Sequence, residues 1–235
     1  MLRSFGWGDF ISLLHGAGWT IVLCVAAGVA GTLIGLLLAI AATSPSRIAR
    51  WVASSYVLVI RGIPLLVIVF FAYFGIPLMF PTVDLSAFLT AVIALTVFAS
   101  AYMAEIFRGS INAVPRGQTE AAQALGLGYG HRLRYVILPQ AMRIAVPPGI
   151  GFLIALIKDS SLVTVIGYVE LTQSGTIISN LTAEPIITYL AVAALYFVIC
   201  YGVSRLGAWY ESRSGSREKL TDTEQAPAAL QLEGV

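Results

Sequence analysis

Residues Glu120–Pro139, EAAQALGLGYGHRLRYVILP, form a short polar segment with three glycines, and it lies between runs apolar enough to cross a membrane. Glu120 to Leu125 are mostly strong helix formers, and Gly126 stands where a left-handed residue ends a helix. A second helical piece can begin at His131, and Pro139 interrupts its backbone hydrogen bonds. The segment predicts two helical pieces joined by a hinge, with Glu120 near the positive end of the first helix dipole.

The composition of the chain places it among membrane proteins. Of its 235 residues, 58% are hydrophobic and only 11% are charged, which is far from the balance of a soluble domain. Cys24 and Cys200 both lie inside apolar runs, so we expect them to pack as small apolar side chains rather than to form a disulfide. The formal net charge of +2 gives no indication of a nucleic-acid partner.

The apolar runs predict an all-α membrane protein with about five transmembrane helices. Each run is long enough to cross roughly 30 Å of hydrocarbon at about 1.5 Å per residue. The expected spans are residues 19–42, 51–80, 85–108, 146–166 and 186–206. They make residues 1–210 one transmembrane domain, and the polar residues 211–235 are expected to form a flexible cytoplasmic tail.

Basic residues gather in alternate linkers between the expected spans. Arginines follow the first, third and fifth spans, whereas the linkers around Asp84 and between Gly167 and Pro185 hold acids but no Lys or Arg. The positive-inside rule then predicts that the N-terminus lies outside and the C-terminus in the cytoplasm. The segment 117–139 is therefore expected on the cytoplasmic face.

Small residues recur every four positions in the first span. They are Ala27, Gly31, Gly35 and Ala39, which together give one smooth face for the close approach of another helix. The face can serve packing within the protomer or across a dimer, and we favour packing within the protomer.

No enzymatic motif is visible in the chain. It has no G-x-x-x-x-G-K-[ST] loop, and its two lysines are Lys158 in a span and Lys219 in the tail. His15 and His131 are expected on opposite sides of the membrane, which excludes a shared metal site or triad. We therefore expect no enzyme and no cofactor bound by this chain, and any ATP hydrolysis must come from a separate subunit.

Three charges lie near the middle of expected spans. Each of Arg61, Lys158 and Asp159 costs at least ~2.5 kcal/mol there unless it is paired or faces water. Arg61 and Lys158 can bind a substrate carboxylate and Asp159 an α-ammonium group, and Pro64 breaks the helix beside Arg61. The alternative is that Asp159 forms an ion pair with Lys158 or with Arg61 that only joins helices.

Glu105 and Arg108 lie three residues apart near the cytoplasmic end of the third span. This spacing puts both on one helix face. We expect a structural ion pair rather than a binding site.

The spacing of Glu120-Ala121-Ala122, Gly126 and Leu138-Pro139 resembles the EAA loop of ABC-importer permeases. Further stretches resemble landmarks of the permeases for polar amino acids, the histidine, glutamine and arginine type. They are Arg61-Gly62-Ile63-Pro64, the run from Ala101 to Gly109, Gly117-Gln118, and Lys158-Asp159-Ser160-Ser161-Leu162.

The resemblance implies a permease subunit in the bacterial cytoplasmic (inner) membrane that imports a polar amino acid. It implies a second permease subunit as homo- or heterodimer, two ABC ATPase subunits that carry ATP and Mg²⁺, and an extracytoplasmic amino-acid-binding protein, with no nucleic acid involved. The implied ATPase-coupling residues are Gly117, Gln118, Glu120, Ala121, Ala122, Gly126, Leu138 and Pro139. The implied substrate path is Arg61, Pro64, Lys158, Asp159, Ser160 and Ser161.

Two other functions fit the apolar spans. A self-sufficient secondary transporter or channel would use Glu105, Lys158 and Asp159 as an ion relay, although the two halves of the chain show no convincing internal repeat. A membrane scaffold would explain the spans but not the charges within them.

Overall fold

The computed structural model describes residues 4–82 and 85–213 of the chain, and this part is helical without strands. The helices are α1 (Trp7–Thr43), α2 (Arg47–Gly62), α3 (Leu65–Phe70), α4 (Ile76–Met79), α5 (Ala87–Ala113), α6 (Arg116–Ala124), α7 (Tyr129–Arg132), α8 (Leu138–Asp159), α9 (Leu171–Thr182) and α10 (Pro185–Arg213). Two π-helical turns, η1 (Phe71–Gly75) and η2 (Leu133–Ile137), and the 3-10 helix η3 (Ser160–Ile166) join neighbouring helices.

Within the described part of the chain, four helical stretches are long and apolar enough to cross a membrane. They are Trp7–Thr43, Ala87–Ala113, Tyr129–Ile166 and Pro185–Arg213. The pair Arg47–Gly62 and Leu65–Met79 also passes this test when taken together, and it gives a fifth candidate. The prediction of an all-α membrane fold with about five spans is confirmed.

The second span, expected over residues 51–80, is broken beside Arg61 as Pro64 predicts. It consists of two helices bent by 102° at the break between Gly62 and Leu65. Ile63 adopts an extended conformation with φ −105° and ψ 131°, as expected for the residue before a proline. Pro64 then precedes the first turn of α3 without an N–H group to continue the ladder.

Other helix boundaries also differ from the expected ones. The first helix begins at Trp7 instead of residue 19, and the fourth begins at Tyr129 instead of residue 146. The expected linker between the fourth and fifth spans contains α9, Leu171–Thr182. These differences have a common reason: apolar runs mark where a helix meets hydrocarbon, whereas polar residues beyond the run can continue the same helix. The tail 211–235 lies mostly outside the described residues.

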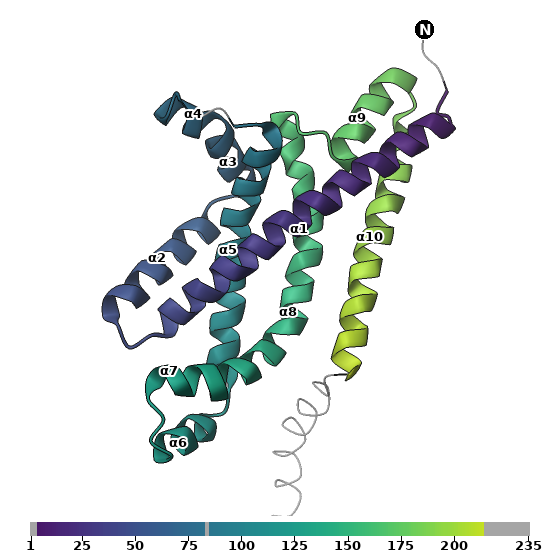
Figure 1. Cartoon of the computed structure of the whole chain (residues 1–235). Coiled ribbons are helices and arrows are strands. Elements are labelled where there is room, and N and C mark those ends of the chain that lie inside the picture. Colours follow the sequence, from purple (N-terminus) through teal and green to yellow (C-terminus); the bar gives the residue numbers. More distant parts are fainter. Residues whose placement is uncertain (1–3, 83–84, 214–235) are drawn as a thin grey trace, which may run out of the picture.

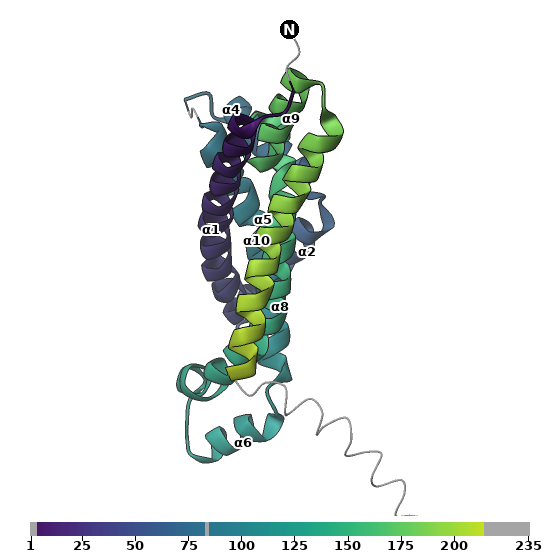
Figure 2. The ribbon, with the colours of Figure 1, turned by 90° about the vertical axis from the view of Figure 1, so that its right-hand side faces the viewer.

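The long helices run side by side between two ends of the molecule (Figure 1). The N-terminal end of α1 lies beside α9 at one end, and α6 and α7 lie at the other (Figures 1 and 2). Helix α1 crosses α5 and α8, and its C-terminal end comes close to α2 through a short connection (Figure 1). The chain therefore places the glycine-containing polar segment at one extremity of the bundle.

The close contact between α1 and α5 is made by the small residues of the first span. Ala27 and Ala39 are fully buried. A Cβ atom added at Gly31 would lie 2.5 Å from the Cβ of Ala99, and one added at Gly35 would lie 2.7 Å from the Cβ of Met103. The smooth face of α1 thus packs within the protomer, as the four-residue spacing favours.

We expect Gly31→Leu to disrupt the protomer, because its side chain would collide with the backbone of α5 at Ala99. Overpacking of this kind costs about 1–3 kcal/mol or more. The matched control is Gly18→Leu, since Gly18 is on the same helix and no atom lies within 4 Å of its added Cβ. Thermal unfolding of the purified proteins in detergent checks the prediction, and equal midpoints for both variants would contradict it.

Candidate functional site

The polar segment at the end of the bundle begins with α6, Arg116–Ala124. Pro115 stands at its N-cap, where its fixed φ and missing N–H suit a helix start. The helix therefore begins four residues before Glu120, whose carboxylate lies outside the first turn. The expectation that Glu120 interacts with the positive end of a helix dipole is wrong for this reason.

Helix α6 ends at Gly126 in a Schellman motif. Gly126 has φ +73°, so it adopts the left-handed conformation that its position predicts. Its N–H donates to the carbonyl of Gln123 at 2.9 Å, and the N–H of Leu127 donates to the carbonyl of Ala122 at 3.0 Å. The glycine is required here because a Cβ would be strained at this φ.

The segment is tied to the bundle at several points. The side chain of Ala122 is buried, and the Tyr129 hydroxyl donates to the carbonyl of Thr43 at the end of α1, at 3.2 Å. The Gln140 amide donates to Oε1 of Gln118 at 3.3 Å. A small apolar core lies beneath these contacts and consists of Val114, Leu133, Ile137 and Ala141. Helices α6 and α7 are therefore seated on the ends of α1, α5 and α8.

The expected break at Pro139 is absent. Pro139 lies in the first turn of α8, where the missing N–H is tolerated, and the ladder is adjusted upstream by the π-helical turn η2. Residues Tyr129–Ile166 form one continuous helical stretch. The two helical pieces are joined at Gly126, as expected, and only the predicted interruption at Pro139 is wrong.

Most of the predicted coupling residues lie on the surface. Gly117, Gln118, Glu120, Ala121, Gly126 and Pro139 are exposed, Leu138 is half-buried, and only Ala122 is buried. Leu125, at the end of α6, is 80% exposed. The segment thus offers a surface of mixed polar and apolar groups at the end of the bundle.

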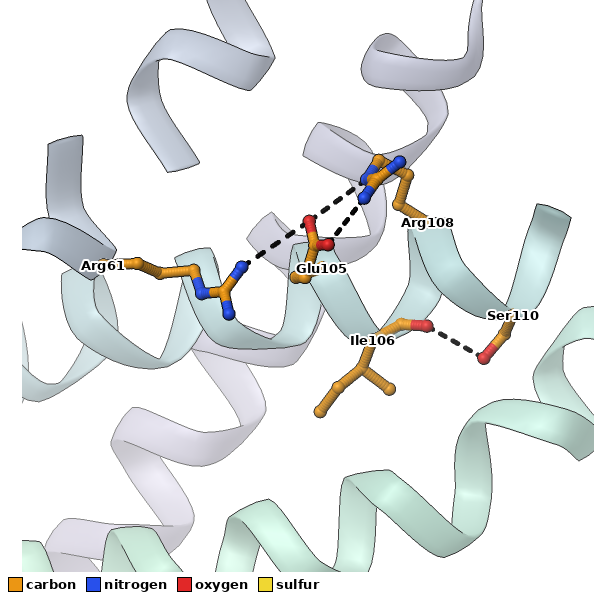
Figure 3. A network of polar contacts seen from close by, with 5 residues as sticks. All are labelled: Arg61, Glu105, Ile106, Arg108 and Ser110. Carbon is orange, nitrogen blue, oxygen red and sulfur yellow. Dashed lines mark hydrogen bonds and ion pairs between the residues drawn. The ribbon is translucent and has the colours of Figure 1, made fainter. Parts of the chain in front are cut away.

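A cluster of three charges connects α2 with α5 (Figure 3). The Arg108 guanidinium donates to both oxygens of Glu105, through Nε at 3.1 Å and Nη2 at 2.6 Å, so the predicted pair is present. Figure 3 shows the Glu105 carboxylate between two guanidinium groups, and Nη1 of Arg61 lies 3.8 Å from its Oε2. Glu105 therefore belongs to a bridge between two helices as well as to a pair on one helix.

Arg61 also lies against aromatic rings that lead to α8. Its guanidinium carbon is 5.3 Å from the centroid of the Tyr102 ring. That ring stacks on Phe152 of α8 with centroids 5.4 Å apart and an interplanar angle of 11°. Cation–π contact and stacking thus offset part of the cost of placing Arg61 in a span.

The alternative for Asp159, an ion pair with Lys158 or Arg61 that only joins helices, is not formed. Among the described residues, no salt bridge within 4.0 Å joins Asp159 to Lys158 or to Arg61. The reason is geometric for Arg61, whose side chain is directed to Glu105 and Tyr102 on α5. The partner of Arg61 is Glu105, which only the packing of α2 on α5 brings near.

Lys158 lines a cavity of about 590 Å³ between the end of α8, α9 and α10. Its lining residues are Ile154, Lys158, Ser161, Thr172, Ala193, Tyr196, Phe197 and Cys200. Asp159 is not among them, and Ser160 is fully buried with its hydroxyl donating to the carbonyl of Ile157 at 2.8 Å. Of the residues predicted for the substrate path, the structure brings together Lys158 and Ser161 in this cavity and places Arg61 and Pro64 elsewhere.

A buried glutamate beside this cavity was not predicted as a site residue. Glu170 is fully buried at the N-cap of α9, where its side chain accepts from the N–H groups of Thr172 and Gln173. It also accepts hydrogen bonds from three hydroxyl groups, those of Thr20, Thr164 and Tyr196. The sequence did contain one indication of this role, because Glu170 comes directly before a helix. Side chains with an oxygen acceptor are preferred at that N-cap position.

Comparison with known proteins adds independent evidence. Residues 31–215 match the family described as the inner membrane component of binding-protein-dependent transport systems. The chain is 40% identical over 192 residues to the probable amino-acid ABC transporter permease protein YckA of Bacillus subtilis (strain 168), which covers 82% of this chain and 84% of the relative. It is 39% identical over 193 residues to the glutamine transport system permease protein GlnP of Escherichia coli (strain K12), with 82% and 88% covered.

A solved structure agrees with these relatives. The crystal structure of an amino acid ABC transporter with histidines superposes with a TM-score of 0.80 at 39% identity, and the match covers 86% of this chain and 94% of that one. The fold, the seated polar segment and the extent of the sequence match all point to one family. The chain belongs to the inner membrane components of binding-protein-dependent transport systems, the permease subunits of ABC transporters.

Proposed function

We propose that this chain is the permease subunit of an ATP-driven importer for polar amino acids in a bacterial cytoplasmic membrane. Relatives at 39–40% identity are named as amino-acid and glutamine permeases, which supports the substrate class. The absence of a phosphate-binding loop in the sequence supports a division of labour, in which partner ATPases hold ATP and Mg²⁺.

The observation that carries this proposal is the continuous helical stretch from Tyr129 to Ile166. One end of it is seated beside α6, and the other end carries Lys158 in the cavity wall. At about 1.5 Å per residue, Tyr129 and Lys158 are roughly 44 Å apart along the helix axis. A push on the exposed segment would be passed to the cavity wall through this continuous stretch of chain.

This mechanism requires partner proteins. Two ABC ATPases dock on residues 117–139 from the cytoplasm and close on each other when they bind ATP. A second permease subunit, the same chain or a related one, completes the pathway, and an extracytoplasmic binding protein delivers the amino acid. The N-terminus then lies outside and the C-terminus inside, as the arginine distribution predicts.

The substrate path centres on the cavity of Lys158. The ammonium group of this lysine lies within a span and can bind the carboxylate of a substrate. Ser161 lines the same cavity. The side chain of Arg61 is 42% exposed, and its contact with Glu105 is long at 3.8 Å, which supports a further role for its donors. We propose that Arg61, Asp159 and the bend at Pro64 contribute on the α2 side of the pathway.

A secondary transporter or channel built on Glu105, Lys158 and Asp159 is the competing function. The engagement of Glu105 by two arginines weighs against it, because a relay group must exchange its proton or ion. Purified chain in liposomes, tested without any ATPase, decides between the two. Gradient-driven accumulation of labelled amino acids under these conditions would overturn the importer proposal.

We expect Gly126→Val to abolish ATP-dependent uptake while the protein stays in the membrane. A side chain at φ +73° costs about 1–2 kcal/mol, and valine is strained further by its branched Cβ. The end of α6 would therefore rearrange at the surface that meets the ATPase. Uptake of a labelled mixture of the twenty standard L-amino acids, by cells that lack their own copy of the chain, measures the effect.

Gly18→Val is the control for this experiment. Gly18 is exposed on α1 and no atom lies within 4 Å of its added Cβ, so uptake should match the wild type. Normal uptake by Gly126→Val at equal membrane abundance would contradict the assignment of the coupling segment.

We expect Lys158→Met to reduce uptake at least tenfold without loss of assembly. Methionine keeps a similar length and apolar stem but removes the charge that we assign to the substrate carboxylate. Lys158→Arg should retain part of the activity because it keeps the charge. Uptake of the same labelled mixture and co-purification with the ATPase are measured together, and wild-type uptake by Lys158→Met would refute the substrate-path assignment.

A further inference from the structure

Glu170 accepts hydrogen bonds from four structural elements at once. Its Oε1 accepts from the Thr164 hydroxyl at 2.9 Å and the Gln173 N–H at 2.8 Å, and its Oε2 accepts from the Thr172 N–H and the Tyr196 hydroxyl, both at 2.9 Å. The Thr20 hydroxyl of α1 adds a longer contact of 3.4 Å to Oε2. The single proton of Thr20 also has a nearer acceptor, the Gly16 carbonyl at 3.2 Å. The four shorter contacts all come from donors, so the carboxylate fixes the direction of their protons.

The direction of these protons determines what the neighbouring hydroxyl groups can do. Tyr196 has one hydroxyl proton, and it is donated to Glu170. The contact of 2.9 Å between the hydroxyl groups of Tyr196 and Thr172 must therefore be donated by Thr172. Both hydroxyl groups have then used their only proton, and each has only lone pairs left for a further partner.

Tyr196 and Thr172 line the same cavity as Lys158. The cavity wall thus combines one cationic group with two hydroxyl oxygens that can only accept further hydrogen bonds. Such a wall repels a carboxylate at the hydroxyl pair and attracts it at the lysine. The wall therefore offers separate partners for the carboxylate and for the ammonium group of a zwitterion.

We infer that Thr172 and Tyr196, oriented by the buried Glu170, accept hydrogen bonds from the α-ammonium group of the substrate while Lys158 binds its carboxylate. This inference rests on the proposed function, because it takes the Lys158 cavity as part of the import path. It assigns the substrate ammonium group to the two hydroxyl groups instead of to Asp159, because Asp159 does not line the cavity. Glu170 acts as a positioning residue, since it is fully buried and does not reach the cavity.

Tyr196→Phe tests the role of the hydroxyl pair. The change removes one acceptor and leaves the two backbone N–H contacts of Glu170 at the N-cap of α9 in place. We expect the concentration for half-maximal uptake of the labelled L-amino acid mixture to rise about tenfold, the scale of one lost hydrogen bond to a charged group. The maximal rate should stay close to that of the wild type, whereas the thermal midpoint should fall because Oε2 of the buried Glu170 loses one donor.

The readout specific for ammonium recognition is competition by analogues. Unlabelled amino acids should compete more strongly than their des-amino analogues against the wild type, and this preference should shrink in Tyr196→Phe. Tyr201→Phe is the matched control, because Tyr201 lies on the same helix, is 54% exposed and does not line the cavity. An unchanged preference in Tyr196→Phe would overturn the inference.

Glu170→Gln tests the positioning role. The introduced amide keeps one acceptor oxygen and replaces the other by an NH2 donor that faces donors. Where the NH2 group takes the place of Oε2, the proton of Tyr196 loses its acceptor and the hydroxyl chain can reverse. We expect the same loss of preference for amines as in Tyr196→Phe, together with a lower thermal midpoint from the weakened N-cap. A lower midpoint with an unchanged preference would mean that Glu170 serves α9 alone.

Lys158→Met separates failure of this inference from failure of the proposed path. Reduced uptake by Lys158→Met together with wild-type behaviour of Tyr196→Phe would refute the hydroxyl pair and leave the path intact. Wild-type uptake by Lys158→Met would refute both the path and the inference that rests on it.

Discussion

The structure depends first on the close contact between α1 and α5. Gly31 and Gly35 leave no room for a Cβ atom against Ala99 and Met103, so the two backbones approach as nearly as helices can. In a membrane no hydrophobic effect drives helices together, and dense packing of small residues takes its place. The position of α5 along α1 then determines where Tyr102 and Glu105 are presented to α2 and α8.

The charges in the spans are placed by this packing rather than by the helices that carry them. Glu105 lies between Arg61 and Arg108, and Arg61 also stacks on Tyr102. Each contact offsets part of the cost of a charge in the membrane. Lys158 has no ion-pair partner within the described residues, and it faces a cavity instead. That contrast separates charges that join helices from a charge available to a ligand.

The helical stretch Tyr129–Ile166 connects the two ends of the molecule. Its first turns share a small core with α5, and the far end of η3 meets the Glu170 network through Thr164. The exposed polar segment and the cavity of Lys158 are thus connected by one continuous helical stretch. The left-handed Gly126 lies just outside this element and leaves α6 a separate unit.

The sequence by itself determined the local features of this protein. Apolar length gave the spans, the four-residue spacing of small residues gave the packing face of α1, and the position of Gly126 after strong helix formers gave its left-handed cap. These features depend on neighbours along the chain. Pro64 marked the place of the break in the second span, but the pairing of Arg61 with Glu105 and the convergence of donors on Glu170 were decided only by tertiary structure. They depend on which helices pack together and on how far each helix is shifted along its neighbour. Partners such as Thr20 and Glu170 are distant in sequence, and the residue pattern of one helix does not specify its position along another.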